Sequence, residues 1–475
     1  MFQQGPEGEA AVPQGAIIVI DLGKTLSKVS LWSRYGRCLD KVTRPNQRQA
    51  AAPYVPLDTA ATADWILEAL ASFAGHPVEY IVPVAHGAAV AGLRGTELAL
   101  IPPDYEWEAP AAQLAEYRTG RDAFAITGSP ALPAGLNLGA QLHYLEALGG
   151  FDGVTLLPYA QYWAWLLTGR AVSEVTSLGC HTDLWAPAAA DFSPMAKERG
   201  WAAQFAPLVK AGDVVGTLLP EVATRTGLSP EVKVLAGLHD SNAALLAARG
   251  FAEISDSEAT VLSTGTWFVA MRLPASPIDL TALPEACDCL VNVDAYGRPV
   301  PSARFMGGRE IESVIGIDTR RVDIKPDQPS LLAAVPKVLA DGAMLLPTLA
   351  PGCGPYPEGP GEWISEPAGW FEKRAAMCLY AALVTDKALN LIGSKDRLLV
   401  EGRFAEAEVF VRALASLRPA MTVYTANAHN DVSFGALRLI NPVLRPQGKL
   451  ARVAPLDQDL TAYKNTWTHL VESKQ

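Results

Sequence analysis

Residues 16–32, AIIVIDLGKTLSKVSLW, contain the pattern on which the fold prediction rests. The apolar run 16–20 has the length of a buried strand, and it stops at Asp21. A second β-type run, residues 28–32, follows at hairpin distance. The sequence therefore predicts an opening strand–turn–strand unit whose turn carries Gly23.

The turn contains Gly23-Lys24-Thr25, which looks like the end of a nucleotide-binding P-loop. The spacing excludes that motif, because no glycine stands five positions before Gly23 and because a P-loop leads from a strand into a helix. The pattern Asp21-x-Gly23-x-Thr25-x-x-Lys28 could bind phosphate by a different arrangement of groups. A carboxylate at a strand end can hold hydrated Mg²⁺, the glycine allows close approach, and the hydroxyl and ammonium groups donate to phosphate oxygens. The alternative is an ordinary Asp-x-Gly turn.

Helical and strand patterns alternate between about residues 60 and 245, which favours an α/β sheet. A second β-type opening occurs at 259–262, which leads into Ser263-Thr264-Gly265-Thr266. Small hydroxyl residues around a glycine can present backbone N–H groups to an anion, although a plain hairpin turn is the alternative. The second half of the chain thus begins, like the first, with a β-type run that leads into a glycine-containing turn.

A third motif, Gly237-Leu238-His239-Asp240-Ser241-Asn242, follows a strand-like run at 232–235 and precedes a helix-like run at 243–246. Ligands of open α/β sheets bind at such junctions. Asp240 is therefore a candidate general base for a substrate hydroxyl. The alternative is that Asp240 or Ser241 only caps the helix.

Two helices are predicted late in the chain from apolar residues at helical spacing, over 374–392 and 406–418. The stretch 351–361 lies after Thr266 and before the first of these helices, and it holds four Gly and four Pro in 11 residues. It must be a loop, and a loop of this length usually has a function.

Composition excludes several classes of protein. The chain has 475 residues with 49% hydrophobic residues, which argues against disorder and suggests two or three domains. A formal net charge of -11 argues against a nucleic-acid partner, and no apolar stretch approaches the length of a membrane span. Residues 1–15 are expected to be a disordered lead-in rather than a secretory signal. Six cysteines are too few for a disulfide scaffold, and Cys180-His181 lacks a second pair for zinc, so a reduced, cytoplasmic protein is expected.

Taken together, the three motifs resemble the superfamily of sugar kinases, Hsp70 and actin, and within it the FGGY family of carbohydrate kinases. The resemblance runs from about residue 17 to residue 440. It implies two related actin-like (ribonuclease H-like) α/β domains with a catalytic cleft between them. It implies a sugar-binding domain at 16–248, a nucleotide-binding domain at 249–441 and a C-terminal tail at 442–475.

The resemblance also implies ATP and Mg²⁺ as ligands. Asp21 is expected to place Mg²⁺ through water. The residues expected to hold the nucleotide are Asp21, Gly23, Thr25, Lys28, Thr264, Gly265, Thr266, Gly402 and Arg403. The adenosine region is expected at 400–404 and 433–437. This chain has Glu401-Gly402-Arg403 where the family usually has two or three consecutive glycines, and the departure bears on the adenine contact.

For the sugar, the resemblance implies a site on the first domain. The expected contact residues are His86, Gln161, Trp163, His239 and Asp240, with Asp240 as the catalytic base. The segment 159–165 offers aromatic faces and an amide, although packing of a helix core is the alternative for Trp163 and Trp165.

The segments 179–185 and 305–309, with His239-Asp240, look most like the rhamnulokinase and fuculokinase side of the family. The implied substrate is a ketose such as L-rhamnulose, L-fuculose, L-fructose or a pentulose. The sequence is compatible with a homodimer. It is also compatible with two other functions of the same fold, a catalytically silent sugar-binding protein and an ATPase that needs no sugar.

Overall fold

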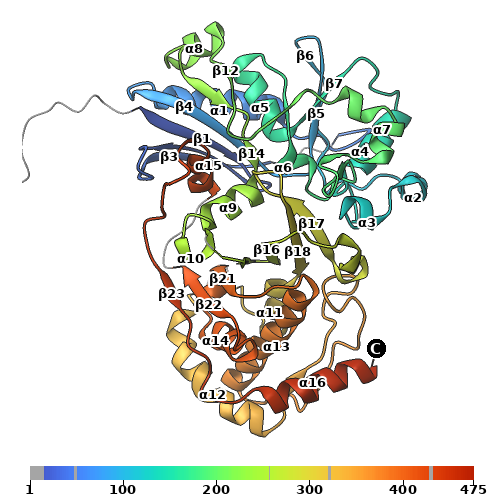
Figure 1. Ribbon diagram of the computed structural model, residues 1–475, viewed down its shortest axis with the longest axis vertical. Helices are drawn as coiled ribbons and strands as arrows, with labels where there is room; N and C mark the ends of the chain where they lie inside the picture. Colours follow the sequence, from blue (N-terminus) through green and yellow to red (C-terminus); the bar gives the residue numbers. More distant parts are fainter. Residues whose placement is uncertain (1–14, 48–50, 256, 319–322, 427–431, 475) are drawn as a thin grey trace, which may run out of the picture.

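The structure is a computed structural model that describes residues 15–47, 51–255, 257–318, 323–426 and 432–474. It consists of two α/β units stacked along the long axis of the molecule, each built on one seven-stranded sheet (Figure 1). The first half of the chain forms the upper unit and most of the second half forms the lower one. Except for Gly15, the lead-in expected at 1–15 lies outside the described residues.

The first sheet has the order β12-β13-β4-β1-β2-β3, and β14 also pairs with β4. β1, β2 and β3 are antiparallel neighbours, whereas β4 is parallel to β1, β13 and β14. Its strands are β1 (Ala16–Leu22), β2 (Leu26–Trp32), β3 (Cys38–Pro45), β4 (Val78–Ala85), β12 (Val214–Thr217), β13 (Lys233–Leu235) and β14 (Leu238–His239).

The second sheet has the order β17-β18-β16-β15-β21-β22-β23. Its central strand β15 has an antiparallel hairpin partner, β16, on one side and a parallel strand, β21, on the other. β1 of the first sheet has the same surroundings, so the predicted pair of related α/β domains is confirmed. The strands are β15 (Ala259–Thr264), β16 (Phe268–Leu273), β17 (Cys289–Val293), β18 (Pro299–Phe305), β21 (Arg397–Gly402), β22 (Thr422–Ala426) and β23 (Leu450–Arg452).

Smaller sheets and the helices complete the two units. The smaller sheets are β5 (Val90–Arg94) with β6 (Glu97–Leu100) and β7 (Thr155–Pro158), β8 (Ser173–Glu174) with β11 (Leu208–Val209), β9 (Trp185–Ala186) with β10 (Asp191–Phe192), and β19 (Met344–Leu345) with β20 (Trp363–Ile364). The helices up to the second sheet are α1 (Thr59–Ser72), α2 (Ala111–Gly120), α3 (Phe124–Thr127), α4 (Leu138–Ala147), α5 (Tyr159–Thr168), α6 (Val175–Leu178), α7 (Pro194–Glu198), α8 (Pro220–Thr226), α9 (Asp240–Ala248) and α10 (Ala252–Ser255). The later helices are α11 (Gly307–Ile315), α12 (Gln328–Ala340), α13 (Trp370–Leu391), α14 (Glu408–Leu417), α15 (Val432–Ile440) and α16 (Thr461–Lys474).

The uninterrupted apolar run of β1 follows from burial on both of its faces. Ile18 and Ile20 pack into a cluster with α1, α5 and α8. Ile17 and Val19 point to the opposite face and pack with α9 and α15. A strand with one solvent-facing side would alternate apolar and polar residues, and β1 does not.

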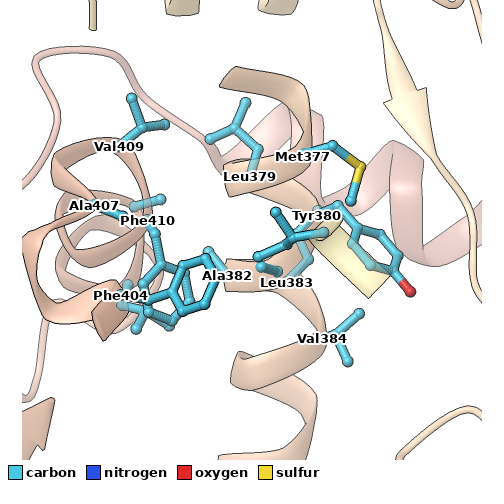
Figure 2. Packing of buried hydrophobic residues seen from close by; sticks show 14 of the residues in the cluster. Met377, Leu379, Tyr380, Ala382, Leu383, Val384, Phe404, Ala407, Val409 and Phe410 are labelled. Carbon is cyan, nitrogen blue, oxygen red and sulfur yellow. The ribbon is translucent and has the colours of Figure 1, made fainter. Parts of the chain in front are cut away.

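The core of the second unit surrounds α13, which packs on α11, α12 and α14. Figure 2 shows Phe404 and Phe410 on the side of α13 where Ala382 lies, whereas Met377 and Tyr380 extend to its other side within the same core cluster. The predicted helices at 374–392 and 406–418 correspond to α13 and α14, with α13 beginning four residues earlier.

Two helices connect the units. α9 lies between the sheets, because Leu246 belongs to the apolar cluster of the first sheet and Leu245 to that of the second (Figure 1). α15 lies between β22 and β23 of the second sheet in sequence but packs against α9, β1 and β4. A Cβ on Gly435 would stand 1.8 Å from the carbonyl oxygen of Ala243, so the two helices are in backbone contact.

The residues after 442 also belong to folded structure. β23 pairs with β22, and α16 places Tyr463 and Trp467 in the core of the second unit. Among the described residues, no helix has both the length and the apolar character that crossing a membrane requires.

Candidate active site

Three neighbouring strands of the first sheet end at one edge. β1 pairs in parallel with β4, and β14 pairs in parallel with β4, so that Asp21 is opposite Val84 and Val84 is opposite Leu238. Asp240 follows two positions after Leu238, where α9 begins. At the usual strand spacing the two backbone segments are roughly 10 Å apart. Asp21 and Asp240 therefore emerge at the same edge of the sheet.

The first predicted phosphate turn connects β1 and β2. Asp21 and Lys28 are cross-strand partners, and Oδ2 lies 3.2 Å from Nζ. The turn is closed by Gly23 N–H, which donates to Leu26 O at 3.1 Å. Asn46, the residue after β3, supports the turn, because its amide nitrogen donates to Gly23 O at 2.7 Å. The hydroxyl-bearing Thr25 is exposed.

Lys24, inside this turn, reaches a segment far away in sequence. Its ammonium group pairs with Asp104, lies 3.7 Å from Glu106, and sits 4.6 Å from the ring centre of Tyr105. The ring of Tyr105 in turn contacts the ring of His86 edge to face, at 5.3 Å. The first turn is thereby joined to the residue that follows β4.

A cavity of about 200 Å³ opens beside this turn. Most of the residues that line it are polar, and they include Thr25, Asn46, Asp58, His86, Asp104 and Tyr159. Burial lowers the pKa of His86, which a hydrogen bond with Gly87 O and the charge of Asp240 partly oppose. Burial raises the pKa of Tyr105, and Glu106 and Asp240 add to that rise. Asp240 is thus close enough to act electrostatically on both rings.

Asp240 is in the first turn of α9, with its side chain 27% exposed. Oδ1 accepts a hydrogen bond from Ser241 N at 2.6 Å and lies 3.1 Å from Nε2 of His239. The N-terminal end of a helix favours a negative charge. His239 is the N-cap of α9 and its side chain does not cap the helix, so Asp240 contributes its charge at the helix start and keeps a carboxylate oxygen for chemistry.

The second predicted phosphate turn lies between β15 and β16. Gly265 N–H donates to Trp267 O at 3.0 Å, and Arg309 N–H donates to Thr266 O at 3.3 Å. A Cβ on Gly308 would stand 1.9 Å from Gly265 O, so the start of α11 packs directly on the turn. Only glycine permits this approach.

Thr264 joins this turn to the predicted adenosine segment. Its hydroxyl donates to Glu401 O at 2.6 Å and accepts from Phe404 N at 3.0 Å. Gly402 has φ +83°, and a Cβ there would stand 2.2 Å from Thr264 O. Arg403 points to α11, with Nη1 3.3 Å from Oε1 of Glu312. The position that demands glycine in Glu401-Gly402-Arg403 therefore has it.

Comparison with known proteins gives the family. The model of the FGGY carbohydrate kinase C-terminal domain matches residues 256–448. The crystal structure of a carbohydrate kinase from Novosphingobium aromaticivorans is similar with a TM-score of 0.94 and 66% sequence identity, covering 97% of this chain and 99% of that chain.

The chain belongs to the FGGY family of carbohydrate kinases.

More distant structures share the fold with this FGGY kinase. A ligand-bound xylulose kinase from Lactobacillus acidophilus has a TM-score of 0.79 at 13% identity, covering 97% of this chain and 98% of that chain. A glycerol kinase from Plasmodium falciparum, with ADP, has a TM-score of 0.78 at 10% identity and the same coverage. No curated protein matched the chain. As a carbohydrate kinase the protein is an enzyme, and carbohydrate kinases use ATP, typically with Mg²⁺.

Two of the residues predicted to contact sugar in this FGGY kinase are fully buried. Trp163 is 1% exposed and packs in the core against the rings of Tyr159 and Tyr162, which is the alternative that the sequence left open. Gln161 is 0% exposed, and its amide nitrogen donates to the carbonyl oxygens of Ala236 and Gly237 at 3.1 Å. Gln161 thus supports the segment before Asp240 from behind, and neither residue lines the cavity beside His86.

Between the two units of the FGGY kinase lies a further cavity of about 1120 Å³. Its lining from the two halves includes Arg118, Arg121 and Pro133 on one side, and Trp267, Arg304 and Gly352 on the other. Arg121 bridges the units, with Nη1 2.9 Å from Oε1 of Glu285 and Nη2 3.2 Å from Oδ1 of Asp183. The Gly/Pro loop at 351–361 contributes its first residues to this cavity.

Sequence reasoning missed the segment 104–106 and the neighbours of His239. Lys24 and Asp104 are 80 positions apart, and no local pattern connects them. The signal available in the sequence was the lysine inside the turn, which the P-loop comparison had already singled out.

Proposed function

We propose that this carbohydrate kinase transfers the γ-phosphoryl group of ATP to a hydroxyl of a ketose, with Asp240 as general base. The observation that carries the proposal is the common edge at which β1, β4 and β14 end. It brings Asp21, His86 and Asp240 to one side of the sheet. The general base, the carboxylate that would bind magnesium and the cavity for the sugar are then close enough to act on one sugar and one ATP molecule bound side by side.

The residues present suit a hydrated magnesium ion. Among the described residues, no three His, Cys, Asp or Glu side chains form a cluster that could enclose a metal. Mg²⁺ usually keeps several waters and binds through one or two carboxylates and the substrate phosphates. Asp21, at a strand end with its side chain 15% exposed, supplies one such carboxylate. When bound there, the ion would neutralise charge on the phosphate oxygens.

The chain's own groups then divide the work of phosphoryl transfer. Asp240 accepts the proton of the sugar hydroxyl while that oxygen forms its bond to the γ-phosphorus. The bond from this phosphorus to the bridging oxygen breaks, and ADP leaves with its electron pair. Lys28 and the backbone N–H group of Thr266 donate to phosphate oxygens, whereas the N–H of Gly265 closes the turn on Trp267 O. Closure of the two units around the substrates would exclude water and limit hydrolysis of ATP.

A ketose is the sugar class that the motifs favour. The segment 179–185 and the His239-Asp240 pair resemble the rhamnulokinase and fuculokinase side of the family. The cavity beside His86 offers carboxylate, amide and hydroxyl groups, which suit a small polyhydroxy compound.

A screen for sugar-dependent ADP formation tests the proposal. The panel contains L-rhamnulose, L-fuculose, L-fructose, D-ribulose and D-xylulose, with glycerol and gluconate as non-ketoses. We expect one or more ketoses to give turnover well above the rate without sugar. ADP formation at the same rate without sugar would mean a sugar-independent ATPase. Sugar binding without ADP formation would mean a catalytically silent binding protein, and turnover with glycerol or gluconate alone would refute the ketose assignment.

A further inference from the structure

A buried pair of complementary groups lies next to Asp240. Cys180 is 3% exposed and His239 is 4% exposed, and the sulfur of Cys180 lies 3.8 Å from Nε2 of His239. The same Nε2 lies 3.1 Å from Oδ1 of Asp240. One imidazole nitrogen therefore faces a buried sulfur and the partly exposed carboxylate together.

The rest of the His239 ring is also enclosed by polar groups. Nδ1 lies 3.3 Å from the amide nitrogen of Asn242, and among the described residues the amide oxygen of Asn242 has no hydrogen-bond partner. Turning this amide over would let its oxygen accept a hydrogen bond from Nδ1–H. Both ring nitrogens would then donate, which is the pattern of an imidazolium cation. His239 N–H donates to Thr176 Oγ1 at 2.9 Å and fixes the backbone.

The surrounding charges favour this protonation. Burial lowers the pKa of His239, but the negative charges of Cys180 and Asp240 raise it above that of free histidine. Burial raises the pKa of the Cys180 thiol, but His181 and His239 bring it below its usual value. The titratable groups that face His239 are Cys180, Asp240, Glu174 and His86, and His181 faces Cys180.

We propose that Cys180 and His239 form a thiolate–imidazolium pair that positions Asp240 for proton abstraction. The proposal rests on the role of Asp240 in the proposed function. His239 donates Nε2–H to Oδ1, the same oxygen that accepts from Ser241 N at 2.6 Å. The protein donors thus converge on Oδ1, and Oδ2 is the oxygen that accepts the sugar proton. His239 is a positioning residue, and Cys180 acts through it.

The thiolate explains how a cation can lie beside a base without weakening it. A lone imidazolium makes a neighbouring carboxylate a poorer proton acceptor. A thiolate beside the same ring nitrogen, Nε2, offsets that charge, so that the carboxylate is oriented but keeps its basicity. A neutral imidazole carries a single N–H, and with that proton on Nδ1 the Oδ1 atom of Asp240 would keep its hydrogen bond from Ser241 N but lose the one from His239.

Gly87, the residue after His86, leaves room for the side chains of Cys180 and His239 because it has no side chain of its own. A Cβ on Gly87 would stand 2.9 Å from Nε2 of His239 and 3.7 Å from the sulfur of Cys180. The backbone that follows β4 therefore packs directly on both groups. A side chain at this position would push the imidazole away from Asp240.

The first test is the ultraviolet absorbance of the thiolate in the full-length protein without sugar or ATP. At neutral pH, the spectrum of the wild type minus that of Cys180→Ser should show one thiolate. The His239→Gln variant should lack this signal, and Cys38→Ser, which removes an exposed cysteine, should keep it. A neutral thiol at position 180 in the wild type would overturn the proposal. This readout does not depend on kinase activity, so it survives a failure of the proposed function.

The second test is kinetic. Cys180→Ser and His239→Gln should lower kcat by roughly tenfold or more with little change in the KM for sugar. In Cys180→Ser, the loss of the thiolate lowers the pKa of His239, so the alkaline fall of kcat should begin at a lower pH. His239→Gln retains an N–H donor and should keep more activity than His239→Ala, at equal thermal stability. A wild-type kcat and pH profile in Cys180→Ser would refute the positioning role.

Discussion

The ammonium group of Lys28 lies 3.2 Å from the carboxylate of Asp21, across the antiparallel pairing of β1 and β2. Each side chain holds the other at the strand end where phosphate is expected. Replacing Asp21 by Asn keeps the shape but removes the charge that would attract Mg²⁺.

We expect Asp21→Asn to lower kcat by at least about tenfold and to raise the Mg²⁺ concentration needed for half-maximal rate. The measurement is a magnesium titration of ADP formation at saturating ATP. Asp40→Asn, an exposed change on β3, is the matched control and should behave like the wild type. An unaltered magnesium curve in Asp21→Asn would remove Asp21 from the proposed metal site.

Replacing the base should separate binding from chemistry. Asp240→Asn is expected to keep the fold and the affinity for ATP, and to lose turnover by at least about a hundredfold, because the amide cannot accept the hydroxyl proton. Calorimetric titration with ATP and the ADP-release assay measure the two quantities. Turnover near that of the wild type would refute the role of Asp240 as general base.

The contact between Gly402 and Thr264 makes a prediction about the nucleotide. Gly402→Ala places a Cβ 2.2 Å from Thr264 O at φ +83°, and should destabilise the fold by about 1–3 kcal/mol while raising the KM for ATP. Gly297→Ala is the control, because Gly297 has φ +78° but open space around its Cβ position. It should share the backbone strain and leave the KM unchanged. Equal effects of the two variants on KM would contradict the proposed link.

We expect Arg121 to stabilise the folded protein as well as to connect the two units through its ion pair with Glu285. Arg121→Met leaves Asp183, which is 1% exposed on its side chain, without its cation, a change that typically costs about 3–5 kcal/mol. Burial already raises the pKa of Asp183, and losing Arg121 raises it further. The loss of stability should therefore be largest at high pH and shrink as the pH falls through the raised pKa. Thermal melts across pH check this, with Arg225→Met at an exposed ion pair as the nearly silent control.

Glu174 provides a second pH prediction. Burial raises its pKa to about 7, against which hydrogen bonds from Thr176 act. The folded protein thus holds a proton that the unfolded chain releases near the ordinary pKa of glutamate, so the stability from this site is lost as the pH rises toward 7. Glu174→Gln keeps an oxygen to accept from Thr176 and needs no proton. Its melting temperature should exceed that of the wild type at pH 8 and approach it near pH 5. A pH-independent difference would contradict the raised pKa.

The sequence was informative where structure is local. The run at 16–20 predicted a buried strand, and the apolar spacing around Met377 predicted α13. The turns at Gly23 and Gly265 were found because glycine and hydroxyl residues between two β-type runs form a recognisable local pattern.

Pairings between distant segments could not be predicted in this way. The sulfur of Cys180 meets the ring of His239 across 59 positions, and Lys24 meets Asp104 across 80. Trp163 shows the opposite problem, because a buried aromatic and a sugar-stacking aromatic have the same helical spacing. Only the packing of the helix against the first sheet separates the two.

The position of α15 has a consequence for how the protein is made. This helix covers one face of the first sheet, yet its residues are among the last to be synthesised. A ribosome that has completed the first sheet has therefore not supplied the helix that shields Ile17 and Val19. The nascent chain must protect that apolar surface by other means until more than nine-tenths of it has been translated, and the upper unit expressed by itself should aggregate.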